Sequence, residues 1–134
     1  DVLAKLDDEL VKRLVDAPQP GRALCFEDQY LSTGGQLYEL MVGHDRFNAD
    51  LRPLVSKLLR ARKDPPVICA HPYDAAAALI ATEAGVVLTN PDGTPFDAPI
   101  DVESDVAWVG YGNQALRERI EPVLQKLLEE AELA

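Results

Sequence analysis

Cysteine is scarce in this sequence, and long apolar runs are missing from it. The two cysteines, Cys25 and Cys69, have apolar neighbours, and a chain of 134 residues can bury a core without disulfides or a structural metal. We therefore expect two reduced core thiols. No run approaches the roughly 18 apolar residues of a membrane span, and the N-terminus does not resemble a signal peptide. These absences predict a cytoplasmic protein with no membrane partner.

Basic residues are also few. The chain has 13 Lys and Arg against 23 Asp and Glu, a formal net charge of -10. Because binding a phosphate backbone requires a broad basic surface, this balance argues against nucleic acid as a partner. A small anion is still possible, since a few backbone N–H groups at a helix N-terminus can bind one in an acidic protein.

Length and composition predict a single domain over residues 1–134, because 47% hydrophobic residues suffice for one core. Apolar residues at spacings of three and four predict an amphipathic helix within residues 1–17, and the α/β domain proper follows over residues 23–134. The chain begins without an initiator Met. We therefore expect a processed product or an excised part of something longer.

Short apolar segments alternate with helical patterns along the rest of the chain. The predicted strands cover residues 23–26, 47–51, 67–70, 86–89 and 106–109. The predicted helices begin near residues 32, 53, 75 and 113, and Pro122 should kink the last one or mark a restart. This alternation predicts a layered α/β fold with a mixed, mostly buried β-sheet flanked by helices.

The strongest candidate for chemistry is the strand–loop–helix segment of residues 67–77. Asp74 follows a predicted buried strand at the opening of a helix, where α/β folds commonly bind ligands. The helix dipole favours an Asp in a first turn whether or not it has a function, so both interpretations stay open. His71 in the same loop is either a ligand or base, or a hydrogen-bonded structural residue.

A second candidate lies at residues 32–35, Ser-Thr-Gly-Gly, before an apolar helical pattern. Glycines at a helix N-terminus allow an anion to approach the backbone N–H groups, but short glycine turns also serve simply as loops. Residues 91–94, Pro-Asp-Gly-Thr, look like a metal-binding element, yet their position between apolar segments favours a turn. The basic residues of the helix after Pro53 could bind phosphate or form a solvated face.

Taken together, residues 71–97 resemble a signature of the inositol monophosphatase family. That signature runs Pro-Trp-Asp, small residues, an apolar helix, Glu-Ala-Gly-Gly, a short strand and Asp-Gly-x-Pro-Phe, and this chain keeps the order over about 27 residues. Residues 33–36 look like the family's Gly-Ser-Ala-Ala element, and residues 46–50 fall where it has Gly-Arg-x-Asp-Ala-Tyr. The likeness covers most of residues 23–125 and corresponds to the family's C-terminal half.

The resemblance implies a magnesium-dependent phosphomonoesterase that acts on a small phosphate ester. Position by position, Asp74 corresponds to a metal-ligand aspartate, while Thr33, Gly34 and Gly35 correspond to the element whose backbone contacts substrate. Arg52 stands near a position that often carries a substrate-binding acid, and we expect it to bind substrate. Magnesium and other hard cations are held by carboxylate oxygens, which suits Asp74.

Other features depart from the family. Tyr73 replaces the usual Trp, and about 15 residues, 53–67, are inserted before the metal aspartate. The family's Glu-Glu and Asp-Pro-Ile-Asp-Gly-Thr elements, which carry most metal ligands, are missing from this sequence. We therefore expect the isolated chain to bind magnesium weakly or not at all and to be inactive, its site being completed by an N-terminal half or a partner chain.

A second hypothesis is a non-catalytic ligand-binding or assembly module that retains the fold. If the chain is one half of a larger protein, an apolar face meant for the missing half would favour self-association, so we also consider a homo-oligomer.

Overall fold

The computed structural model describes residues 2–16, 24–25, 32–65 and 67–134. Its helices are α1 (Val2–Leu14), α2 (Thr33–Met41), α3 (Arg52–Ala61), the short 3₁₀ helix η1 (Pro72–Ala75), α4 (Ala78–Glu83) and α5 (Gln114–Glu130). Its strands are β1 (Phe47–Asp50), β2 (Val87–Thr89) and β3 (Trp108–Tyr111). The described residues thus form a mixed α and β fold, as the sequence predicted.

The three strands form one sheet in the order β1-β3-β2, with β3 in the centre. Both pairings are antiparallel: Phe47 faces Tyr111 across one, and Val87 faces the same Tyr111 across the other. The prediction of a mixed sheet is therefore wrong for the part of the chain that the structure describes. The prediction of burial holds best for β3, in which every residue is buried, whereas β1 and β2 are mostly half-buried.

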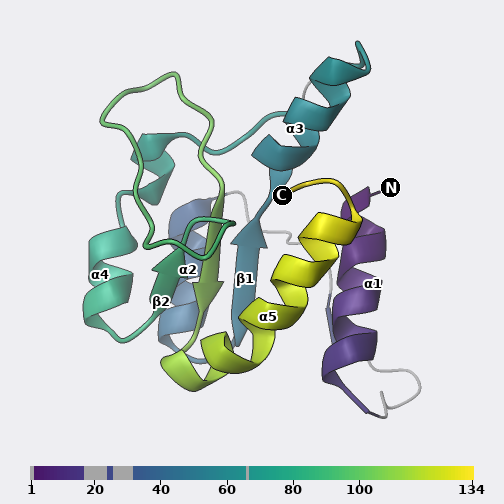
Figure 1. Cartoon of the computed structure of the whole chain (residues 1–134). Helices are drawn as coiled ribbons and strands as arrows, with labels where there is room; N and C mark the ends of the chain where they lie inside the picture. The colour runs from purple at the N-terminus through teal and green to yellow at the C-terminus, as the bar shows by residue number, and fades with distance from the viewer. Residues whose placement is uncertain (1, 17–23, 26–31, 66) are drawn as a thin grey trace.

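The alternation of β3 places two apolar clusters on opposite faces of the sheet. Val109 and Tyr111 contribute to the larger cluster with residues of α1 and α5. Trp108, the neighbour of Val109, belongs instead to a smaller cluster with residues of α2 and α4. The helices accordingly form layers on both sides of the sheet, with α5 and α1 on one side and α2 and α4 on the other (Figure 1).

Close packing on the second face explains Gly110. A Cβ added there would lie 2.6 Å from Leu40 Cδ1 and 3.0 Å from Trp108 Cζ3. Leu40 and Trp108 are both 2% exposed and belong to the cluster between β3, α2 and α4. The absence of a side chain at residue 110 therefore lets α2 approach the central strand.

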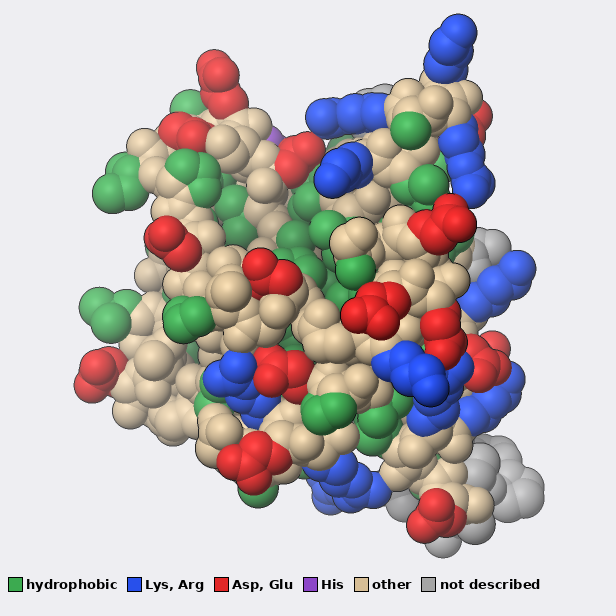
Figure 2. Space-filling view, viewed as in Figure 1, with side chains coloured by type: hydrophobic (Ala, Val, Ile, Leu, Met, Phe, Trp, Pro, Cys, Tyr) green, Lys and Arg blue, Asp and Glu red, His purple; other side chains and the backbone are tan. Residues whose placement is uncertain are grey.

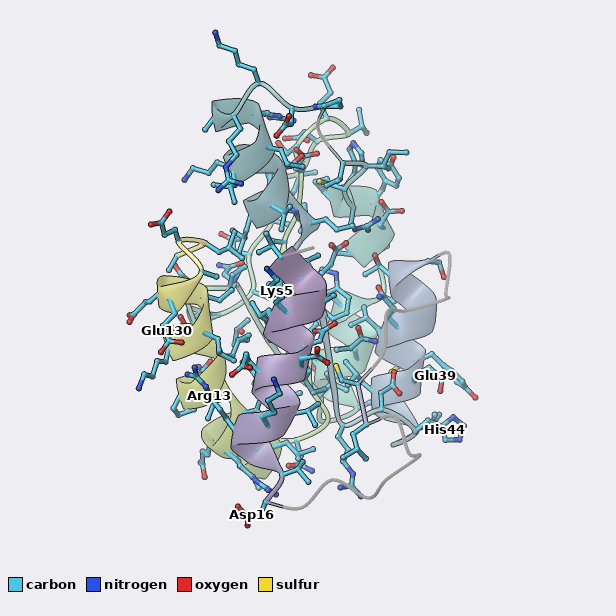
Figure 3. The ribbon with its side chains drawn as sticks, turned by 90° about the vertical axis from the view of Figure 1, so that its right-hand side faces the viewer. Lys5, Arg13, Asp16, Glu39, His44 and Glu130 are labelled. Atoms are coloured by element: carbon cyan, nitrogen blue, oxygen red, sulfur yellow. The ribbon has the colours of Figure 1, made fainter. Side chains whose placement is uncertain are left out.

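Helix α1 lies beside α5, as Figure 3 shows from the side. Its buried residues Leu6 and Leu10 join the larger cluster, which confirms the amphipathic pattern. The Arg13 guanidinium donates to the Glu130 carboxylate with Nη2 2.6 Å from Oε2, and this exposed pair links the two helices. Asn113 caps α5 by accepting the N–H of Leu116. The helix continues through Pro122, so the prediction of a restart at that proline is wrong.

Several predicted element boundaries need correction. Residues 67–70 do not form a strand, because the N–H of Val67 donates to Ser56 Oγ at 3.2 Å and Ile68 is 85% exposed. Ala70 keeps one isolated bridge to Val106. The helix predicted to begin near residue 75 is preceded by η1 and begins, as α4, at Ala78.

The predicted strand at residues 106–109 starts two residues later than expected, at Trp108. Of the predicted strand at residues 23–26, positions 23 and 26 lie outside the described residues, and Leu24 and Cys25 form a bend. The turn expected at residues 91–94 is confirmed, since Gly93 has a positive φ angle of 81°. Gly85, which follows α4, also has a positive φ angle, 97°, a conformation that glycine adopts without strain.

Candidate functional site

A cavity of about 860 Å³ lies among the N-terminal turns of α1 and α2, strand β1, the start of α3 and residues 67–70. Its volume falls within the roughly 300–1,000 Å³ typical of small-molecule sites. Thr33, Arg52 and Asp74, which come from three separate segments, all line it. The cavity thus brings together three of the five residues that the sequence selected.

Asp74 lies in η1, and its carboxylate has a structural partner. Oδ2 accepts the backbone N–H of His71 at 2.9 Å, and Nδ1 of His71 lies 4.0 Å from the same oxygen. The His71 ring stacks on Tyr73 with centroids 5.4 Å apart. The Asp74 side chain is still 37% exposed, so the carboxylate that closes the loop also borders the cavity.

The turn at residues 32–35 begins α2 as predicted. Ser32 Oγ accepts the N–H of Gly35 at 3.1 Å, and the buried Thr33 lines the cavity. Gly34 and Gly35 belong to the same turn but are not among the lining residues. A Cβ on Gly34 would meet no atom within 4 Å, so close packing does not require glycine there.

Arg52 and Asp50 form the main ion pair of the cavity. Asp50 ends β1 with its side chain 3% exposed, and Arg52 begins α3 with its side chain 45% exposed. Arg52 donates Nε–H to Asp50 Oδ1 at 2.8 Å and Nη2–H to Oδ2 at 2.5 Å. The hydrogen bonds to Asp50 are the main reason that the pKa of Arg52 is raised further above its usual value.

Sequence reasoning missed Asp50 as a site residue. The available signal was its position: an aspartate at the end of a strand, two residues before an arginine that opens the next helix. Side-chain amides extend this polar wall, because Gln36 Nε2 donates to Asn48 Oδ1 at 3.5 Å and both residues line the cavity. The site therefore offers donors and acceptors beside the ion pair.

Cys69 also lines the cavity, and burial raises the pKa of its thiol above the ordinary value. The thiol is therefore protonated at neutral pH, as expected of a core cysteine. Cys25 and Cys69, which both lie in the described part of the chain, are not joined in a disulfide.

The residues present supply only part of a metal centre. Among the described residues, no group of three or more His, Cys, Asp and Glu side chains is placed to hold a metal ion. Asp74 offers one partly exposed carboxylate, and no second set of ligands reaches it from the residues that the structure describes. Residues 90–94 form a turn instead, in which Asp92 accepts the N–H of Thr94 at 3.0 Å.

Two surface features lie outside the cavity. Basic side chains gather over α3 at the upper right of Figure 2, where Arg60, Arg62 and Lys63 are exposed, which favours the solvated face predicted for this helix. Hydrophobic side chains protrude over α4 and the loop before β3 at the left edge of the same view. The exposed ones include Leu79 at 71%, Ile80 at 64% and Ile100 at 104%.

No helix in the part of the chain that the structure describes is long and apolar enough to cross a membrane. Comparison of the chain with protein-family models, with curated proteins and with solved structures finds no match. The resemblance to the inositol monophosphatase family therefore stays a prediction based on residues and their order.

Proposed function

We propose that this chain is the C-terminal half of a magnesium-dependent phosphomonoesterase similar to inositol monophosphatase. The observation that carries the proposal is the cavity lined by Thr33, Arg52 and Asp74. The sequence selected these positions in three separate segments, and in the fold all three border one concave surface of ligand-binding size.

Each of the three residues has a distinct part in this proposal. Thr33 donates its hydroxyl to a phosphate oxygen at the start of α2, where the helix dipole favours negative charge. Asp74, held by the His71 N–H, offers one carboxylate ligand for magnesium. When bound, magnesium would supply neutralisation of the phosphate charge and activation of a water molecule. The remaining ligands come from an N-terminal half or a partner chain.

A magnesium and phosphate-ester titration tests the proposal. Amide NMR spectra of the chain are recorded with Mg²⁺ and then with glycerol 2-phosphate, and the expected shifts cluster around Thr33 and Asp74 at millimolar concentrations. Asp74→Asn should remove the magnesium-dependent part. Asp64→Asn, which makes the same change at an exposed residue after α3, should leave it unchanged.

Two results would contradict the proposal. Magnesium shifts of equal size in the Asp74→Asn and Asp64→Asn chains would remove Asp74 as a ligand. Magnesium-dependent hydrolysis by the chain alone, abolished by Asp74→Asn, would show that the site is not divided between two halves.

The exposed apolar residues favour an assembly function as a second candidate. Ile68, which borders the cavity, is 85% exposed, and Tyr73 beside Asp74 is 57% exposed. A partner that covered these side chains would also close the cavity. Sedimentation over a range of concentrations distinguishes this candidate, because a chain that stays monomeric at high concentration does not use the face for self-assembly.

A further inference from the structure

The ion pair between Asp50 and Arg52 leaves one edge of the guanidinium for a ligand. An arginine side chain has five N–H donors in a fixed plane. Asp50 takes the edge formed by Nε and Nη2. The other edge, formed by Nη1 and Nη2, makes no further hydrogen bond to the residues that the structure describes, and Arg52 lines the cavity. Two parallel N–H groups on that edge match the two oxygens of a carboxylate.

Asp50 determines how the remaining edge can be used. Its carboxylate is almost completely buried and also accepts the backbone N–H of Arg52 at 3.2 Å. The backbone N–H of Arg52 holds the carboxylate, and the two hydrogen bonds from the guanidinium to that buried carboxylate restrict its orientation, which reduces the entropy lost when a ligand binds. Asp50 therefore acts as a positioning residue for Arg52.

The charge of the pair decides which anion fits. Asp50 neutralises the single positive charge of Arg52, so the pair has little net attraction for a dianionic phosphate group. It does present a directional fork, which recognises a planar monoanion through two hydrogen bonds. Arg52 is thus better suited to a carboxylate of the substrate than to the phosphate that Thr33 and Asp74 are proposed to bind.

We propose that the cavity selects phosphate esters that also carry a carboxylate, with Arg52 binding the carboxylate and Asp50 orienting Arg52. This inference rests on the proposed function, because it assigns the second functional group of the same substrate. The two hydrogen bonds from Arg52 should provide about tenfold selectivity in affinity, a low value for charge-assisted hydrogen bonds because Asp50 already neutralises the arginine charge.

The test compares 2-phosphoglycerate with glycerol 2-phosphate, which differ by a carboxylate in place of a hydroxymethyl group. Affinities are measured by NMR in the presence of Mg²⁺, and the Nε–Hε signal of Arg52 reports on its own environment. We expect the unmodified chain to bind 2-phosphoglycerate about tenfold more tightly. Arg52→Gln and Arg52→Lys should both lose this preference, the second because lysine keeps the charge but lacks the fork.

Two further variants test whether Asp50 orients Arg52 and whether the loss of any positive charge has the same effect as the loss of Arg52. Asp50→Asn should weaken the preference and broaden or shift the Arg52 signal while glycerol 2-phosphate affinity stays within about twofold. Arg62→Gln makes the same charge change as Arg52→Gln at an exposed residue outside the cavity, and it should leave the preference intact. Amide spectra establish that each variant is folded, and Arg52→Lys provides the test if Asp50→Asn does not fold.

The outcomes distinguish this inference from the proposed function. Equal affinity for both esters, with shifts at Thr33 and Asp74, would overturn the role of Arg52 and leave the phosphatase proposal standing. If neither ester binds but glycerate shifts the Arg52 Nε–Hε signal, the carboxylate site stands and the phosphatase proposal fails. If the Arg52 signal responds to none of the three compounds, the inference is wrong.

Discussion

Replacing Gly110 with alanine should destabilise the protein through a single added methyl group. Residue 110 lies in the central strand β3, and its added Cβ would come within 2.6 Å of Leu40 Cδ1, 3.0 Å of Trp108 Cζ3 and 3.3 Å of Leu88 Cδ2. Contacts below 3 Å require a neighbour to move. Leu40 can move only against a packed cluster, because it is 2% exposed and lies between the sheet and α4.

The expected cost follows from overpacking. Inserting a methyl group into a close-packed core costs roughly 1–3 kcal/mol, and we take about 2 kcal/mol because a leucine methyl group yields more easily than backbone. The entropy of unfolding of a chain this long is about 0.28 kcal/mol/K, from roughly 2.1 cal/mol/K per residue. The melting temperature should therefore fall by about 7 °C.

Gly34→Ala is the matched control, since it adds the same methyl group at the first turn of α2, where nothing lies within 4 Å. Alanine is favoured over glycine in a helix by roughly 0.5–1 kcal/mol, so this variant should be neutral or slightly stabilised. Urea unfolding followed by circular dichroism measures both variants. Equal stability of the two alanine variants would refute the packing argument for Gly110.

Other perturbations act on separate parts of the fold. Asn113→Ala removes the cap of α5 and should cost about 1 kcal/mol in urea unfolding, whereas no change would mean that the cap is dispensable. Leu10→Ala empties a buried position between α1 and the core and should cost roughly 2–5 kcal/mol, with a loss below 1 kcal/mol arguing against this docking of α1. Burial, and then the Glu121 charge, raise the pKa of the Tyr111 hydroxyl. Above about pH 10 the unfolded chain therefore loses this proton before the folded chain does, and the free energy of unfolding should fall by up to about 1.4 kcal/mol per pH unit. The free energy of unfolding of Tyr111→Phe should fall less steeply with pH than that of a Tyr73→Phe control. Ile100→Asp should reduce any self-association seen by sedimentation, and unchanged association would exclude this exposed residue from the contact.

Local patterns predicted the secondary structure well where a short stretch determines it. The amphipathic spacing of α1 and the start of α2 at Ser32 both depend on neighbouring residues alone. The failures have non-local causes. Residues 67–70 are apolar enough for a strand, but the hydroxyl of the buried Ser56 on α3 accepts a hydrogen bond from the N–H of Val67. No pattern within the segment could indicate this contact with α3.

The sequence allowed single residues of the candidate site to be selected, but not their arrangement. Asp74 and Thr33 could be selected from loop and cap chemistry, because each sits at the start of a helical turn. Asp50 was missed because its importance comes from burial and from its pairing with Arg52. The direction of the strands was also beyond the sequence, since alternation of helices and strands suggests crossovers without determining how the strands pair.

The central place of β3 has a consequence for synthesis of the chain. In the part that the structure describes, β1 and β2 both pair with β3 and not with each other, although β3 is the last strand to be made. More than fifty residues must be synthesised after β1 before its partner strand β3 leaves the ribosome. A nascent chain that ends before Trp108 contains neither strand pairing of this sheet, so the sheet can assemble only after β3 has been synthesised.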